Sequence, residues 1–237
     1  MKISEHCFAI TGLFYLPPWT VNAGFVVGNK KTLVIDSSGT YLSAQTIYGY
    51  ALNVRPENKL LLINTEKHLD HIGGNCFFSE MGVPLYGHPG IMRKNEELQN
   101  QLKESCLITK HSERDRECEG IFPFDKTTIV NPNNPITENV EIDLGEEKVE
   151  ILLTPGHTET NITVFLPKDR VAYVGDLIVS DYRPNLGEAN NEKWFKSLEI
   201  IKKLNLDVIV PGHGAVIQGK SKINQAISRI REIIELS

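Results

Sequence analysis

The sequence predicts a protein of the α/β class, and three observations indicate it. Short apolar runs with the composition of β-strands alternate with longer stretches that have the apolar periodicity of helices. These elements come in two similar rounds, each with strands first and helices after. No boundary between them has the composition of a flexible linker. We therefore expect residues 1–237 to form one domain with two halves.

The first half of the chain is predicted to begin with strands. Residues 21–27 and 32–35 are apolar and flank Gly28-Asn29-Lys30-Lys31, which has the composition of a hairpin turn. Residues 60–64 form a short apolar run closed by Asn64-Thr65, as expected of a buried strand. The other elements expected here are a helix over residues 42–54, a strand over 83–86, a charged helix over 89–107 and a loop over 111–135.

The second half repeats the pattern. Strands are expected over residues 140–144, 149–154, 162–166, 171–174 and 207–210. Residues 190–204 are predicted to form an amphipathic helix, because Trp194, Leu198 and Ile201 recur at helical spacing on one face. A second helix is expected over residues 223–236 and closes the chain.

Composition limits the partners. Lys and Arg number 25 against 30 Asp and Glu, so the net charge is −5 and no general attraction to nucleic acid or to an anionic membrane is expected. The four cysteines form no Cys-x-x-Cys pair, which is typical of reduced thiols rather than of a zinc ribbon. No apolar run has the length of a signal sequence or a membrane span. We expect a cytoplasmic protein that acts on a small molecule, and the sequence leaves a homodimer open.

One segment carries a strongly specific pattern of polar residues. Directly after the strand over residues 60–64 comes Glu66-x-His68-x-Asp70-His71, followed by Gly73-Gly74. Residues two apart in an extended segment point the same way, so Glu66, His68 and Asp70 share one side. Four potential ligands within six residues can converge on metal ions, and the glycines let the backbone turn tightly beneath them.

Further candidate ligands follow three later strands. His157 comes after Pro155-Gly156, Asp176 after Gly175 and His213 after Gly212, and each lies directly behind an apolar run. The carboxyl end of a strand is where α/β folds collect functional groups. Each signal is weak alone, but together with the first cluster they indicate a metal site.

In the pattern Glu66-x-His68-x-Asp70-His71, followed by His157, Asp176 and His213, the chain resembles the metallo-β-lactamase superfamily, from the strand over residues 21–27 to His213. The resemblance implies a four-layer αβ/βα sandwich with a metal site at the edges of its sheets. It also implies the ligands of two metal ions: Glu66, His68 and His157 for one, Asp70, His71 and His213 for the other, with Asp176 bridging them.

The chain departs from the family motif at one position, because Glu66 stands where the family normally has His. With Glu66, Asp70 and Asp176 ionised, the charges of three carboxylates, two divalent ions and one hydroxide cancel. A less positive centre acidifies its water less, and a carboxylate shifts metal preference from zinc toward manganese or iron. We expect two divalent ions, zinc first and manganese or iron as alternatives; in a further alternative, Glu66 points away from the site.

The function implied is metal-dependent hydrolysis of a small ester, thioester, lactone or β-lactam. A bridging water activated by the two ions would attack the substrate, and Asp70 is expected to be catalytic by orienting that water. Tyr182 and Arg183 follow Asp176 closely and are expected to contact substrate, although both suit a solvated loop as well. Trp19 is expected as an apolar flap over the site, with core packing as the alternative.

Two other functions stay open. Glu66, His68 and His157 have the composition of a two-His-one-carboxylate iron site. A mononuclear iron site at Glu66, His68 and either His157 or Asp176 suits an oxygenase acting on a thiol or persulfide. The third hypothesis is a non-catalytic metal-binding relative, although the six ligand positions other than Glu66 keep the expected residue types.

Overall fold

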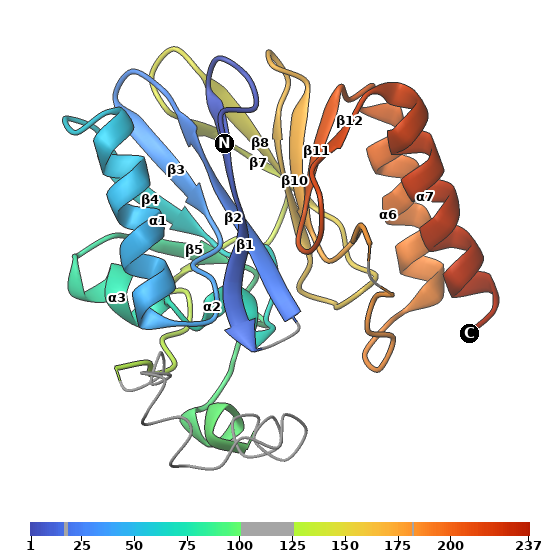
Figure 1. Ribbon diagram of the computed structural model, residues 1–237, viewed down its shortest axis with the longest axis horizontal. Coiled ribbons are helices and arrows are strands. Elements are labelled where there is room, and N and C mark those ends of the chain that lie inside the picture. Colours follow the sequence, from blue (N-terminus) through green and yellow to red (C-terminus); the bar gives the residue numbers. More distant parts are fainter. Residues whose placement is uncertain (17–18, 101–125, 182) are drawn as a thin grey trace.

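The computed structural model describes residues 1–16, 19–100, 126–181 and 183–237. Two six-stranded sheets pack face to face, with helices on the outer side of each (Figure 1). The α/β class and the four-layer sandwich expected from the sequence are confirmed by this arrangement. Within the described ranges, no helix combines the length and apolar character that a membrane crossing needs.

The first sheet contains the amino-terminal strands in sequence order. Its members are β1 (Cys7–Leu16), β2 (Trp19–Val27), β3 (Lys31–Ile35), β4 (Lys59–Ile63), β5 (Leu85–Gly87) and β6 (Asn134–Pro135). The pairs β1–β2 and β2–β3 are antiparallel, whereas β3, β4, β5 and β6 run parallel. The carboxyl ends of β3, β4 and β5 therefore meet at one edge of the sheet.

The second sheet has the order β12-β11-β10-β9-β8-β7. Its members are β7 (Val140–Asp143), β8 (Lys148–Leu153), β9 (Ile162–Leu166), β10 (Val171–Gly175), β11 (Val208–Pro211) and β12 (Ile217–Gln218). Strands β10 and β11 are parallel, so the segments that carry Asp176 and His213 leave the sheet at the same edge.

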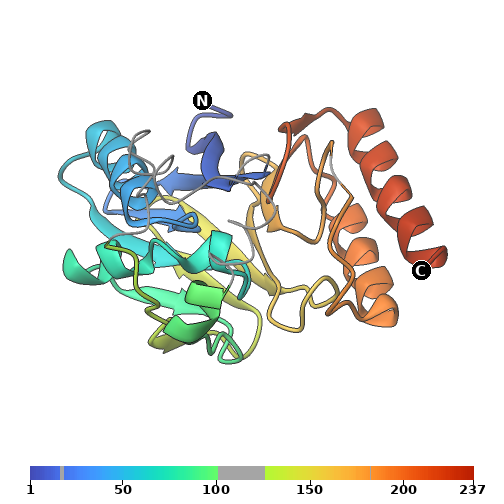
Figure 2. The same cartoon turned by 60° about the horizontal axis from the view of Figure 1, so that its bottom comes forward.

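The helices cover the outer faces. On the first sheet lie α1 (Tyr41–Val54), α2 (Leu69–Ile72) and α3 (Asn75–Glu80), and on the second lie α6 (Asn191–Lys203) and α7 (Lys220–Glu235). Figure 2 shows α6 and α7 side by side on their sheet. Trp194, Leu198 and Ile201 of α6 are all buried, which confirms the predicted apolar face.

The central strands are mostly apolar because both of their faces are covered. In β3, Leu33 and Ile35 belong to the core between the two sheets, whereas Val34 packs into the core beneath α1 and α3. Tyr173 of β10 also lies between the sheets, and its hydroxyl donates to the carbonyl of Phe8 at 2.9 Å. This alternation explains why no polar face marks these strands in the sequence.

Several elements differ from the sequence predictions. Strand β1 was not predicted, and Gly12 with φ +70° lies at a shift in its register that breaks the strand pattern. Helices α2 and α3 and strands β6 and β12 are too short for periodicity to reveal. The helix predicted over residues 89–107 is wrong at its start: a turn at His88–Ile91 precedes it, and residues 95–100 are helical. Residues 101–107 of that helix and 111–125 of the predicted loop lie outside the described residues.

Candidate metal centre

The seven candidate ligands meet at one edge of the two sheets. They arrive on four segments, which follow β4, β8, β10 and β11. Within each of two groups, one ligand atom per residue lies within 4.8 Å of all the others. One group is Glu66, His68, His157 and Asp176, and the other is Asp70, His71 and His213.

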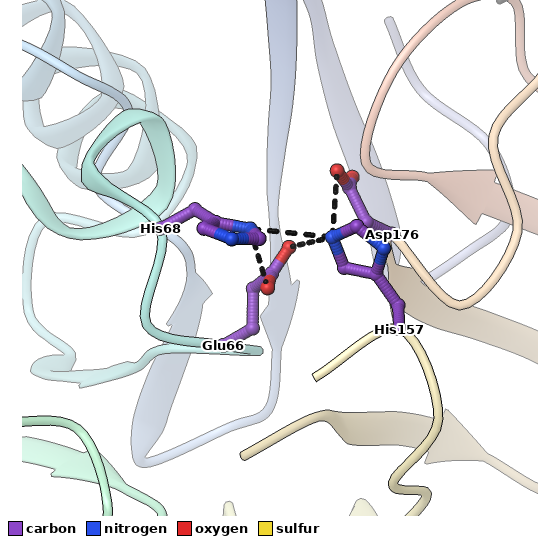
Figure 3. Close-up of side chains that lie close together, drawn as sticks. All are labelled: Glu66, His68, His157 and Asp176. Atoms are coloured by element: carbon purple, nitrogen blue, oxygen red, sulfur yellow. Dashed lines mark hydrogen bonds and ion pairs between the residues drawn. The ribbon is translucent and has the colours of Figure 1, made fainter. Parts of the chain in front are cut away.

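In the first group, side chains point toward a common centre (Figure 3). Nε2 of His157 lies 3.6 Å from Oε1 of Glu66, 3.6 Å from Oδ2 of Asp176 and 3.2 Å from Nδ1 of His68. Oε2 of Glu66 lies 2.9 Å from Nδ1 of His68. Glu66 therefore points into the cluster, and the arrangement in which it turns away is not the one that the structure shows.

The second group adjoins the first through Asp176. Nε2 of His213 lies 3.1 Å from Oδ2 of Asp70 and 3.3 Å from Oδ2 of Asp176. Nε2 of His71 lies 3.4 Å from Oδ1 of Asp176 and 3.4 Å from Oε1 of Glu66. Asp176 thus contacts histidines of both groups, the place that the sequence analysis gave to a bridging ligand.

Several buried atoms of this cluster lie 2.9 to 3.6 Å from other candidate ligand atoms but make no hydrogen bond of good geometry among the described residues. They are both carboxylate oxygens of Glu66, Oδ1 of Asp176 and Nε2 of His71. Burying a charged or polar atom without a partner is costly, so native proteins pair such atoms with each other, with water or with metal. Carboxylate oxygens and imidazole nitrogens are ligands of divalent transition metals. The donor set fits one or two such ions.

The carboxylates of the centre are held ionised. Burial opposes the negative charge of Asp70, but His71 and His213 outweigh it and lower the pKa of Asp70 to about 2. At Asp176, burial raises the pKa, but the nearby His213 and His71 outweigh this effect, so the pKa of Asp176 lies well below its ordinary value. The pKa of Glu66 is lowered too, because His68 and His157 offset its burial.

The pKa values of three histidines of the centre are shifted in the opposite direction, upward. Burial disfavours a charged imidazole, yet Glu66 raises the pKa of His68 to about 9 and Asp176 raises that of His213 to about 11. The pKa of His71 lies well above its ordinary value, because Asp36 and Asp70 outweigh its burial. The cluster therefore presents a strongly negative potential that holds protons, and the same potential attracts metal cations.

Local sequence explains how the first segment turns into the centre. Gly73 and Gly74 follow α2, where a Cβ atom on either residue would lie 2.2 Å from the carbonyl oxygen of Gly39 or Ser37, respectively. Only glycine permits this approach of two backbones. The tight turn beneath the ligands was expected from the sequence, and these contacts give its physical reason.

Asp36 is part of the site and was missed by the sequence analysis. The backbone nitrogen of Thr65 donates to Oδ1 of Asp36, and the Thr65 hydroxyl donates to Oδ2, both at 2.7 Å. Oδ2 of Asp36 also lies 2.9 Å from Nδ1 of His71. This contact turns Nε2 of His71 toward the centre, as outer carboxylates do for metal-binding histidines. A signal was available, since Asp36 directly follows the apolar strand over residues 32–35.

Of the three predicted substrate contacts, the structure describes the side chain of Arg183 alone, so these contacts stay predictions. Trp19 begins β2, but its side chain lies outside the described part. Tyr182 also lies outside the described residues, and Arg183 is exposed on the loop between β10 and α6. The same loop supplies Glu188, which forms an ion pair with Lys67 and has Oε1 3.8 Å from Nε2 of His68. Sequence reasoning gave Glu188 no role.

Comparisons with known proteins agree with this geometry. The profile of the metallo-beta-lactamase superfamily matches residues 16–213. The chain is 24% identical to metallo-beta-lactamase IND-1 of Chryseobacterium indologenes over 218 residues, which cover 90% of this chain and 80% of that protein. It is 23% identical over 199 residues to a linear primary-alkylsulfatase of Pseudomonas sp. (strain ATCC 19151), covering 73% of this chain but only 37% of the alkylsulfatase.

Solved structures show the same fold. A metallo-beta-lactamase from Pontibacter korlensis superimposes with a TM-score of 0.71 over 100% of this chain and 98% of its own, at 16% sequence identity. At that identity the likeness establishes the fold alone. The match of the superfamily profile covers most of the chain and includes every candidate ligand from Glu66 to His213. The chain belongs to the metallo-beta-lactamase superfamily.

Proposed function

We propose that this protein is a hydrolase that uses two divalent metal ions. The observation that carries the proposal is the pair of ligand groups in contact through Asp176, with buried carboxylate and imidazole atoms that face one another without well-formed hydrogen bonds. Membership of the superfamily supports it. The residues proposed to hold the ions are Glu66, His68 and His157 for one, Asp70, His71 and His213 for the other, and Asp176 for both.

Ions bound there would supply a nucleophile at neutral pH and stabilise negative charge on the substrate. The chain's own residues provide orientation and proton transfer. Asp70 is ionised at neutral pH, since its pKa is about 2, so its carboxylate can accept a hydrogen bond from the attacking water. Asp70 is therefore the proposed catalytic residue. Asp36 fixes the ring of His71, and Asp176 lies within 3.4 Å of both His71 and His213.

The proposed substrate is a small molecule with a hydrolysable ester, thioester, lactone or β-lactam bond. Support comes from relatives whose names include metallo-beta-lactamase and alkylsulfatase, both of which cleave a bond in a small molecule. We propose that the protein works in the cytoplasm. The free thiols of Cys7 and Cys76 suit a reducing compartment.

The test combines metal content with activity. Protein purified without added metal should contain two equivalents of zinc, manganese or iron, and should hydrolyse at least one member of a panel of ester, thioester, lactone, β-lactam and alkyl sulfate substrates. The D70A variant should lose that activity and keep its fold. A matched control is D143A, which removes an exposed aspartate from β7. Unchanged turnover in D70A would contradict the proposal.

One observation favours a second candidate. Glu66 places a carboxylate beside His68 and His157, which is the donor composition of mononuclear iron oxygenases. Bound iron at one equivalent, with oxygen consumption on a thiol or persulfide and no hydrolysis across the panel, would support that function instead.

A further inference from the structure

The second ligand group is assembled from both sheets. Asp70 and His71 follow β4 of the first sheet, whereas His213 follows β11 of the second. These residues can share a metal ion only if the turn that carries His213 keeps a fixed position against the first sheet. Elements that cross between the sheets at this edge therefore decide whether the group forms.

Asn22 of β2 connects the first sheet with the turn that carries His213. It is 3% exposed and lies in the first sheet. Its amide nitrogen Nδ2 donates to the carbonyl of Pro211 at 2.9 Å and to that of Gly214 at 2.8 Å. Its backbone nitrogen donates to the carbonyl of Gly212 at 2.7 Å. One residue thus holds the main chain on both sides of His213.

The acceptor side of the same amide is also occupied. Oδ1 of Asn22 accepts from the backbone nitrogen of Gly12 in β1 at 3.3 Å, which fixes the orientation of the side chain. Two residues earlier, the carbonyl oxygen of Thr20 lies 2.5 Å from Nδ1 of His213, leaving Nε2 to face Asp70. Asparagine is the fitting residue, because an aspartate at this place would set a carboxylate oxygen against two carbonyl oxygens.

The turn has little room to move without disturbing the centre. A Cβ atom on Gly212 would lie 2.0 Å from Oδ1 of Asp176, so the backbone of the turn packs directly on that carboxylate. Ser180, in the segment after β10, donates from its backbone nitrogen to the carbonyl of His213 at 3.0 Å. That contact lies within the second half, so it does not set the register between the sheets.

We propose that Asn22 is a positioning residue for His213 and selectively supports binding of the second metal ion. This inference rests on the proposed two-ion centre. His157 in the first group is held differently, since its turn contacts α6 through the bond from Ser197 to the carbonyl of Pro155 at 2.7 Å. Loss of the Asn22 amide therefore acts directly on the second group, whereas the turn of His157 in the first group keeps its own support.

The experiment is a titration of metal-free protein with zinc in competition with a chromophoric chelator, for wild type, N22D and N22A. Removing an outer partner of a metal ligand typically lowers affinity by about 10- to 100-fold. We expect a loss of that size for one of the two ions and near wild-type affinity for the other. N22A is included because it removes the donors without adding a charge to the core.

Asn58 supplies the matched control. It is also buried, and its Nδ2 donates to the carbonyl of Gly28 at 2.9 Å and to Thr32 Oγ1 at 3.1 Å, at the end of β4 away from the ligands. N58D and N58A should lower the melting temperature of the metal-free protein while both ions bind as in wild type. Equal weakening of both ions in the Asn22 variants, or no weakening, would overturn the inference.

A second readout needs no metal. In the metal-free protein, the NMR signals of the His213 imidazole should shift in N22A and not in N58A, because only the first change removes side-chain hydrogen bonds to the His213 turn. Unchanged His213 signals in N22A would also overturn the inference. Failure of the wild-type protein to bind any metal would instead contradict the proposed function, so the two failures are distinguishable.

Discussion

At the scale of single residues, the centre depends on how each imidazole is turned. His71 and His213 both present Nε2 to the cluster, and in each case Nδ1 is occupied, by Asp36 at 2.9 Å and by the carbonyl of Thr20 at 2.5 Å. His68 differs, because its Nδ1 faces Glu66 at 2.9 Å and its Nε2 lies toward Glu188. These outer contacts select the ring nitrogen that faces the proposed metal site.

The D36N variant tests this role for Asp36. Without a carboxylate at Nδ1, the ring of His71 is held less firmly, so metal affinity and turnover should fall by about 10- to 100-fold. Metal affinity by chelator competition is the measurement. D169N is the matched control, because Asp169 accepts from His6 Nδ1 at 3.0 Å and from the His6 backbone nitrogen at 3.1 Å far from the ligands. An equal loss of affinity in D169N would refute a specific role for Asp36.

Glu66 sets the charge of the centre. Replacing it in E66H removes one negative charge, so bound water should ionise at lower pH and zinc should be preferred more strongly over manganese. The acid limb of the profile of kcat/KM against pH should therefore move to lower pH. E66Q is the companion variant, because it removes the charge and keeps an oxygen donor. A profile that is the same in all three proteins would show that Glu66 does not influence the reactive water.

At the scale of elements, the sheets carry the ligands at their strand ends and the helices hold those ends in place. Helix α6 is an example: its Trp194 donates from Nε1 to the carbonyl of Leu177 at 2.9 Å, and its indole lies against His157 with ring centroids 5.5 Å apart. Leu177 directly follows the proposed ligand Asp176. One buried side chain of α6 thus contacts the segments of two proposed ligands.

The start of α6 gives a prediction at this scale. The side chain of Asn190 accepts from the backbone nitrogen of Lys193 at 3.0 Å and caps the helix. N190A should lower the free energy of unfolding by about 1 kcal/mol. Urea denaturation measures it. N185A is the control, since Asn185 accepts from Gly187 in the exposed loop before the helix and caps no helix; a loss as large in N185A would argue against the cap.

At the scale of the whole molecule, two halves close around one strongly charged cluster. In the metal-free protein, His68 has its pKa raised from 6.5 to about 9, so its proton stabilises the folded state fully below pH 6.5 and progressively less as the pH rises through about 9. Metal binding requires neutral imidazole, so the metal-loaded protein gains affinity over the same range of pH.

The difference in stability between the loaded and the metal-free protein should therefore widen from pH 6.5 to 9. Two urea denaturation series, one with saturating zinc and one with chelator, measure this difference at each pH. Buffers of different ionisation enthalpy should also reveal protons released on zinc binding in calorimetry. A difference that is constant across this range would show that His68 does not exchange its proton for metal.

The sequence alone determined the fold class, most of the strands and the ligand types. These features are local. Apolar strands can be predicted from their composition, and the spacing of Glu66, His68 and Asp70 places these residues together within one short segment. The helix over residues 190–204 was predictable because its apolar stripe repeats over several turns. Strand β1 and helix α3 were not, because Gly12 interrupts one pattern and the other is only six residues long.

Only the tertiary structure decided how the ligands are oriented and what holds them. Asp36 and His71 are 35 residues apart, and Asn22 and Gly214 are 192 apart, so no local pattern links either pair. Their contacts arise when two separately patterned sheets pack face to face. Sequence spacing fixes which side chains leave a strand together, whereas hydrogen bonds across the packed sheets fix the atom that each side chain presents.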